Sequence, residues 1–391
     1  MEQPMQIKRV SVEGYRVLKS TSFEPQGLNV LIGANGSGKS TVLDLFALLA
    51  EAMGGKLPKA ISERGGINRL LTLGGPTRLR LKIETTPVGW PASVTESPLL
   101  YELVIMPSGI GYAIASELLI QDRGHSSGKP LAFLERDQGF ATLHDTQDLS
   151  LALPLPVPAE QAAFGWLPRM SLEPETLRSL LATSLYMPPL VLDARSPLRL
   201  PQTLQPPDGA PNASGSDLIS SLYEMRSADE DLWEQLTDVL NAGFPRFRKL
   251  EFPMVAGGQA ALAWYEKDSN APLYANELST GTLRFLHLAA MLLSSKLPGL
   301  VLLDEPELSL HPELLRLLSE LLIQASQRSQ ILVATHSSAL VRWVSPEQVV
   351  VVERDDAGCS LKRGSELNLT HWLDTYTLDQ IWQMGLMGGK P

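Results

Sequence analysis

The stretch of the chain best suited to chemistry is a glycine-rich loop between an apolar run and a helical pattern. Its residues are Gly33, Ala34, Asn35, Gly36, Ser37, Gly38, Lys39, Ser40 and Thr41. This spacing fits the phosphate-binding loop, or P-loop, in which backbone N–H groups and a helix N-terminus face phosphate oxygens. The apolar run over 28–32 predicts a buried strand before the loop, and residues 42–49 predict a helix after it.

Roles for the polar side chains follow from that motif. Lys39 would reach the β- and γ-phosphates of a nucleoside triphosphate, the hydroxyl of Ser40 would be a magnesium ligand, and Thr41 would lie nearby in the first helical turn. The alternative is a glycine-rich turn between strand and helix that binds nothing. The flanking segments favour the phosphate site, so ATP and Mg²⁺ are the expected cofactors.

Two adjacent carboxylates, Asp304 and Glu305, end a second apolar run over 300–303. Because successive residues of a strand point to opposite sides, the two acids should have different roles. We expect Asp304 to hold Mg²⁺ and Glu305 to orient or deprotonate an attacking water. A solvated strand end is the alternative, and the P-loop in the same chain argues against it.

Two further segments resemble motifs of ABC-type ATPases. Residues 276–282 resemble the signature motif, in which Ser279, Gly281 and a helix N-terminus meet the γ-phosphate of a nucleotide held by another subunit. A third apolar run, 331–335, ends in His336, at the position of the switch histidine of those enzymes. Taken alone, a serine and glycine before a helix are also typical of a helix cap, and a histidine at a strand end is typical of a structural residue.

The order of these motifs resembles that of the ABC-type ATPases of the SMC and RecF-like branch. More narrowly, the chain is similar to the compact ATPases of bacterial defence loci related to the overcoming-lysogenization-defect proteins, without their Toprim nuclease domain. Residues 306–312 resemble a D-loop, and 374–382 with 385–391 resemble the closing segment of that group. The same resemblance matches Arg16 to an arginine that approaches nucleotide phosphate. No Q-loop glutamine can be assigned.

The resemblance implies an α/β fold of the ABC-ATPase head type, with a mainly parallel P-loop sheet, an antiparallel lobe and a helical lobe that bears the signature. We expect three parts along the chain. They are an N-terminal ATPase lobe with the P-loop and an antiparallel meander over 1–150, a mainly helical insertion with proline-rich connectors over 151–270, and a C-terminal ATPase lobe with the signature, Asp304-Glu305, D-loop and His336 over 271–391.

Local patterns give the elements within these parts. Alternating residues over 7–12 and short segments between 79 and 143 predict antiparallel strands. The prolines of 153–158 exclude a central strand and predict a semi-rigid connector. Beyond it we expect helices over 159–185 and 217–241, a strand over 190–193 and a loop over 197–216.

Composition limits the classes of function. A formal net charge of −10 argues against a protein that coats nucleic acid through a general positive field. The most cation-dense run, 246–249, is more typical of a solvated strand edge than of a DNA contact, although a DNA contact stays open. The single cysteine, Cys359, excludes an intramolecular disulfide and fits a cytoplasmic protein. No secretory leader and no membrane span are expected.

The resemblance also implies partners. Because the P-loop and the signature serve different nucleotides in this family, we expect an ATP-dependent homodimer, or a higher oligomer, that hydrolyses ATP. The leading hypothesis is an ATPase that regulates a separately encoded effector, such as a nuclease, in DNA-linked or antiphage defence. An ATP-gated scaffold with little turnover and a transporter subunit are the alternatives. Arg16, the long insertion and the missing Q-loop weigh against the transporter.

Overall fold

A six-stranded sheet occupies the centre of the computed structural model, which describes residues 5–87, 97–121, 130–137, 139–143, 153–167, 172–190, 192–355 and 358–389. Its strand order is β10 (Leu185–Met187), β17 (Leu300–Asp304), β18 (Gln330–Ala334), β3 (Leu28–Ile32), β19 (Val349–Asp355) and β20 (Gly358–Arg363). All neighbours pair in parallel except β19 and β20. The predicted α/β class and mainly parallel P-loop sheet are confirmed.

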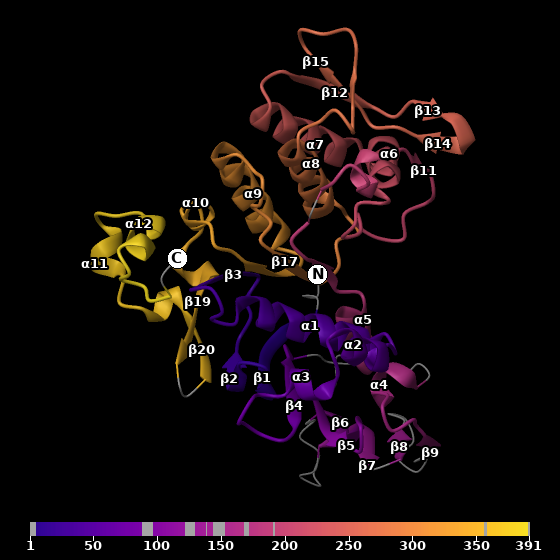
Figure 1. Ribbon diagram of the computed structural model, residues 1–391, viewed down its shortest axis with the longest axis vertical. Helices are drawn as coiled ribbons and strands as arrows, with labels where there is room; N and C mark the ends of the chain where they lie inside the picture. Colours follow the sequence, from indigo (N-terminus) through magenta and orange to yellow (C-terminus); the bar gives the residue numbers. More distant parts are fainter. Residues whose placement is uncertain are drawn as a thin grey trace.

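Neighbouring residues of each central strand pack into different cores. On β3, Leu31 belongs to the core that includes α1 (Lys39–Met53), whereas Val30 and Ile32 belong to the core that includes α8 (Thr280–Leu293) and α9 (Pro312–Ala325). In Figure 1, α8 and α9 lie on one side of β17 and α1 lies on the other. Because both faces are covered, the strands consist mainly of apolar residues, and the charged side chains of the site lie at the strand ends.

A second sheet of eight antiparallel strands forms the lower lobe of Figure 1. Its order is β2 (Leu18–Phe23), β1 (Ile7–Tyr15), β4 (Leu79–Thr85), β5 (Leu99–Ser108), β6 (Gly111–Gln121), β7 (Leu131–Asp137), β8 (Phe140–Leu143) and β9 (Leu153–Pro156). The predicted opening hairpin and meander are confirmed. The short helices α2 (Leu57–Glu63) and α3 (Ile67–Leu70) connect α1 to β4.

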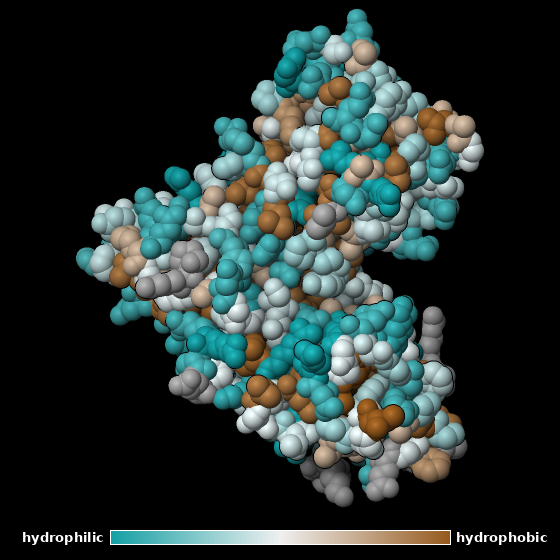
Figure 2. Space-filling view, in the orientation of Figure 1, coloured by the Kyte–Doolittle hydropathy of each residue, from teal (hydrophilic) through white to brown (hydrophobic). Residues whose placement is uncertain are grey.

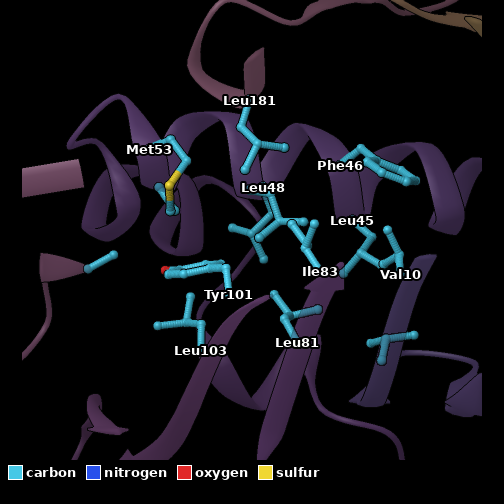
Figure 3. Close-up of a cluster of buried hydrophobic side chains, with 14 of the residues drawn as sticks. Val10, Leu45, Phe46, Leu48, Met53, Leu81, Ile83, Tyr101, Leu103 and Leu181 are labelled. Atoms are coloured by element: carbon cyan, nitrogen blue, oxygen red, sulfur yellow. The ribbon is translucent and has the colours of Figure 1, made fainter. Parts of the chain in front are cut away.

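Helix α1 is held in place by apolar side chains from both sides. Figure 3 shows Leu48 of α1 between Leu181 of α5 (Leu172–Ala182) and a layer of sheet residues that includes Leu81 and Tyr101. Leu48 and Leu181 are at most 1% exposed. The helix that follows the P-loop is therefore fixed between α5 and the antiparallel sheet.

The residues expected to form one helical insertion, 151–270, are distributed over several parts of the molecule. The proline-rich β9 is the edge strand of the antiparallel sheet, where a missing N–H is tolerated, and is not a free connector. Helix α4 (Ala163–Trp166) is anchored by buried Glu117, which accepts hydrogen bonds from the backbone N–H groups of Ala163 and Phe164 at 2.6 and 2.9 Å. Residues 185–187 join the central sheet beside β17.

The rest of this stretch forms the upper, helical lobe of Figure 1. The single helix expected over 217–241 is two helices, α6 (Leu218–Ala228) and α7 (Glu230–Gly243), because Asp229 leaves the helical conformation and caps α7. Two three-stranded sheets complete the lobe: β11 (Gln202–Thr203), β14 (Gln259–Ala260) and β13 (Met254–Val255), and β12 (Phe247–Glu251), β15 (Ala263–Glu266) and β16 (Leu273–Tyr274).

The strand expected over 190–193 is wrong at the positions that the structure describes. Leu190, Leu192 and Asp193 have no strand pairing, and the strand of this region is β10, five residues earlier. The carbonyl of Leu190 accepts a hydrogen bond from Arg284 instead of pairing with a strand. The helical region expected over 159–185 consists of α4 and α5, followed by β10.

Short helices on the left of Figure 1 pack beside the central sheet. They are α10 (Ser338–Val341), α11 (Thr370–Leu373) and α12 (Leu378–Gln383), and α10 contacts both α9 and α12. Figure 2 shows a notch between the helical lobe and the antiparallel lobe. Among the described residues, no helix combines the length and apolar character needed to cross a bilayer.

Leu48 gives a test of how α1 is held. Replacing it with Ala removes buried methyl groups and should lower the free energy of unfolding by about 2 to 5 kcal/mol, measured by urea unfolding. Leu73→Ala is the matched control, because Leu73 is 98% exposed and its loss should change the free energy by less than about 0.5 kcal/mol. Equal effects of the two substitutions would contradict the packing described.

Candidate nucleotide-binding site

The predicted P-loop lies between β3 and α1, and its shape depends on two glycines. Gly33 has a φ of +150°, and a Cβ there would lie 2.2 Å from the carbonyl oxygen of Val352. Gly38 has a φ of +122°, and a Cβ there would lie 3.1 Å from Val17 Cγ2 and from Cys359 Sγ. Side chains at either position would therefore displace the loop.

The start of α1 has free hydrogen-bonding capacity. Gly38 is its N-cap, so no side chain satisfies the first N–H groups of the helix. Ser37 Oγ is buried and has no hydrogen-bond partner among the described residues. Uncapped N–H groups and an unpartnered hydroxyl beside them suit an anion such as a phosphate group.

Lys39 folds back over the loop that precedes it. Its Nζ donates hydrogen bonds to the carbonyl oxygens of Gly33 and Ala34, at 2.6 and 3.1 Å. Burial lowers the pKa of Lys39 to about 8, although the nearby carboxylates of Asp304 and Glu305 oppose that shift. The ammonium group is thus a buried cation held at the phosphate-binding end of the loop.

Ser40 and Asp304 meet, as the sequence predicts for a magnesium site. Ser40 Oγ donates a hydrogen bond to Asp304 Oδ1 at 3.2 Å, and burial raises the pKa of Asp304. One carboxylate and one hydroxyl are the hard oxygen ligands that Mg²⁺ uses together with substrate phosphate and water. The described residues contain no cluster of three or more His, Cys, Asp or Glu side chains suited to a metal held by protein alone. The pair fits Mg²⁺ bound with a nucleotide.

Glu305 and His336 face each other across the ends of β17 and β18. Their Oε1 and Nε2 atoms are 3.8 Å apart, and the Glu305 N–H donates to the carbonyl of Ala334 at 2.8 Å. Burial and the charge of Lys39 lower the pKa of His336, although Glu305 opposes the shift, and the net effect favours the neutral imidazole. A neutral imidazole can donate one hydrogen bond to an anionic oxygen.

Glu307 is a site residue that sequence reasoning did not assign a role. Its Oε1 accepts hydrogen bonds from Thr335 Oγ1 at 2.5 Å and from the His336 N–H at 3.1 Å. Its Oε2 is buried without a hydrogen-bond partner among the described residues, and burial raises the pKa of Glu307. This carboxyl fixes the backbone of the predicted switch segment. A further acid directly after Asp304-Glu305-Pro306 is the sequence feature that could have indicated this role.

The signature segment lies apart from the P-loop of its own chain. Ser279 caps α8 by accepting a hydrogen bond from the Thr282 N–H at 3.0 Å, and a Cβ at Gly281 would lie 2.4 Å from the carbonyl oxygen of Ser309. Within the described ranges, no hydrogen bond or ion pair joins Ser279 or Gly281 to residues 33–41. Within one chain, Ser279 therefore serves as the N-cap of α8.

Arg199 holds the signature loop and was also missed. Its guanidinium donates to the carbonyl of Leu278 at 2.8 Å and to Thr280 Oγ1 at 3.1 Å. Nothing near Arg199 in the sequence indicates this contact, because the loop lies about eighty residues further along.

Comparison with known families agrees with this geometry. Residues 5–71 match an AAA ATPase domain, and residues 176–342 match an AAA domain named for the AbiEii toxin of a type IV TA system. No curated protein matches the chain.

Solved structures of Smc heads match over nearly the whole chain. The Smc head bound to the C-winged helix domain of ScpA has a TM-score of 0.54 at 15% identity, covering 91% of this chain and 97% of that chain. The Pyrococcus furiosus Smc head with an extended coiled coil, bound to the C-terminal domain of ScpA, has a TM-score of 0.54 at 12% identity, covering 95% and 100%. A Pyrococcus yayanosii Smc head gives 0.52 at 10% identity, covering 92% and 97%.

The chain has the fold of an Smc head, and two parts of it match AAA ATPase domains. The expected resemblance and fold class are confirmed.

Unusual backbone conformations mark the elements of this Smc-head fold that are predicted to contact nucleotide. Three non-glycine residues of the described chain have left-handed φ angles: Arg16 at +46°, Glu305 at +49° and Ser309 at +65°. Such conformations cost free energy and persist where the surrounding structure fixes them. Glu305 lies after β17, Ser309 lies against Gly281, and Arg16 lies at the β1–β2 turn.

The side chain of Arg16 forms an ion pair with Asp44 of α1. Its Nη1 lies 3.0 Å from Asp44 Oδ2, and Asp44 also accepts hydrogen bonds from Tyr15 OH at 2.6 Å and Arg64 Nε at 2.7 Å. Asp44 lies one helical turn after Ser40. The structure therefore places Arg16 on the P-loop helix, and its contact with phosphate stays a prediction.

The cations of the run 246–249 interact with acidic and aromatic side chains nearby. Arg246 lies 3.5 Å from Asp268, and Lys249 is paired with Glu251. Arg248 lies over the ring of Tyr265. These contacts along β12 favour the strand-edge interpretation over a DNA contact.

The lowered pKa of Lys39 predicts the pH dependence of catalysis. In the free protein the ammonium loses its proton as the pH rises through about 8, so kcat/KM for ATP should fall about tenfold per pH unit above that value. Bound phosphate raises the lysine pKa again, so kcat at saturating ATP should hold to higher pH. Steady-state turnover between pH 6 and 10 measures both. A kcat/KM that is constant up to pH 10 would contradict the assignment.

Proposed function

We propose that two copies of this chain bind ATP with Mg²⁺ between them and hydrolyse it, and that the cycle regulates a separately encoded effector. The observation that carries the proposal is the meeting of Lys39, Ser40, Asp304, Glu305 and His336 at the carboxyl ends of three adjacent parallel strands. In open α/β sheets this edge is where ligands bind.

Each residue has a role in this proposal that its surroundings support. The N–H groups of residues 33–41 and the Lys39 ammonium would bind the phosphates, and Ser40 with Asp304 would hold Mg²⁺, which would neutralise phosphate charge. Glu305 would accept a proton from the water that attacks the γ-phosphate in line, and the bond from the γ-phosphorus to the bridging oxygen of the leaving ADP would break. His336 donates a hydrogen bond to the γ-phosphate, and Glu307 positions its backbone.

Dimerisation is proposed because, among the described residues, no hydrogen bond or ion pair joins the signature to the P-loop of the same chain. Ser279 is exposed at the start of α8, and its helix lies on the opposite side of the central sheet from α1 (Figure 1). Ser279 and Gly281 would complete the site of the partner copy. The Ser309 carbonyl lies against Gly281 of the signature. A movement of the signature on nucleotide binding would therefore shift the segment that follows Glu305 in the same chain.

The effector is proposed to be another polypeptide in DNA-linked or antiphage defence. The family model named for a toxin of a type IV TA system supports a defence setting, and the Smc heads with a bound ScpA domain support a partner protein. Several cations on the antiparallel sheet are paired with acids, as in Lys8–Glu84, Arg9–Glu24 and Arg80–Glu102, which supports leaving nucleic-acid chemistry to the partner.

Glu305→Gln tests the proposed chemistry. The amide cannot accept the proton, so kcat should fall about 100-fold or more while ATP affinity stays within about threefold. Light scattering should then show a dimer that accumulates with ATP and Mg²⁺. Glu320→Gln is the control, because Glu320 is exposed on α9 and its one ion pair among the described residues is with Arg316. Full turnover in Glu305→Gln would show that another group activates the water.

A further inference from the structure

The chain returns to the P-loop at a point far along the sequence. Gly389 has a φ of +53°, and a Cβ there would lie 3.0 Å from Gly33 Cα and 3.0 Å from Val351 Cγ1. On its other side, Gly33 lies against the carbonyl of Val352. The first glycine of the P-loop is therefore held between β19 and a segment more than 350 residues away in sequence.

Two side chains hold this segment in place. Trp382 of α12 is fully buried in the core, and its indole N–H donates a hydrogen bond to the Gly389 carbonyl. The Gly389 N–H donates to Glu353 Oε1 at 3.3 Å, and a Cβ at Gly388 would lie 2.3 Å from the same oxygen. Both backbone groups of Gly389 are thus satisfied, and a side chain at this position would press on Gly33.

Helix α12 also contacts the element that follows His336. Gln383 Nε2 donates a hydrogen bond to Ser338 Oγ at 2.9 Å, and Ser338 begins α10 two residues after His336. One short stretch of chain therefore touches the surroundings of both the P-loop and the predicted switch.

We propose that residues 382–389 form a clasp that positions the P-loop for nucleotide. This inference rests on the proposed ATP binding and deepens it. Trp382, Glu353 and Gly389 act through Gly33 and do not touch the nucleotide, so they are positioning residues. A P-loop that is fixed before binding loses less conformational freedom on binding, which favours affinity.

The clasp predicts a specific change in the binding and kinetic constants for ATP. Loosening it at Gly389 should raise the Kd and KM for ATP and leave kcat nearly unchanged, because the backbone of Glu305 is bonded to Ala334 and that of His336 to Glu307. A general loss of folded protein would instead lower the active fraction, and with it the apparent kcat, without changing KM.

The first variant is Gly389→Ala in the full chain. The added methyl group presses on Gly33, and the Kd for ATP with Mg²⁺, measured by titration calorimetry, should rise about tenfold with kcat within about twofold. Gly109→Ala is the matched control. Gly109 has a φ of +56° with no atom within 4 Å of an added Cβ, so it carries the same backbone strain without a contact.

The second pair of variants avoids strain at a glycine. Glu353→Ala removes the acceptor of the Gly389 N–H and should raise the Kd and KM about threefold to tenfold. Glu353→Gln keeps a carbonyl oxygen at that position and should restore wild-type affinity to within about twofold. Glu353 is 39% exposed, so neither variant should unfold the protein, and a thermal melt checks this.

The outcomes separate the clasp from the proposed function. Wild-type protein that does not bind ATP with Mg²⁺ would overturn the proposed function and the clasp with it. Wild-type binding together with an unchanged Kd in both Gly389→Ala and Glu353→Ala would overturn the clasp alone. A fall in kcat with constant KM would also overturn it.

Discussion

The parallel pairing of β3, β18 and β17 is the constraint on which the rest of this structure depends. These strands are buried on both faces, so they carry apolar side chains and cannot hold charged groups within the sheet. The charged residues of the site therefore lie where each strand ends. Because parallel strands end at one edge, the pairing brings Lys39, Asp304 and His336 together from segments separated by nearly 300 residues.

Burial then sets the electrostatics at this edge. Lys39, Asp304 and Glu307 are each partly removed from water, and their pKa values are shifted toward the neutral forms. Mutual attraction between the lysine and the acids opposes those shifts. A triphosphate with Mg²⁺ would bring both signs of charge into the same space, so the site is poised for such a ligand.

Much of the site could be predicted from the sequence because each motif is local. The spacing of glycines before Lys39, the strand that ends in Asp304-Glu305 and the strand that ends in His336 are all visible in short windows. Contacts made over long distances could not be predicted, as Arg199 at the signature and Gly389 at Gly33 show. The missed strand β10 is only three residues long and is specified by pairing with β17, whereas Leu190, Leu192 and Asp193, which follow two prolines, have no strand pairing among the described residues.

The central claim is that each reaction centre is shared between two copies of the chain. Mixing two inactive variants, Lys39→Ala and Ser279→Arg, tests it most directly, because the mixed dimer contains one site with both an intact P-loop and an intact signature. With random pairing, the mixture should recover about a quarter of wild-type ATP turnover, while each variant alone stays inactive. A mixture as inactive as its components, or full turnover by Ser279→Arg alone, would contradict the account.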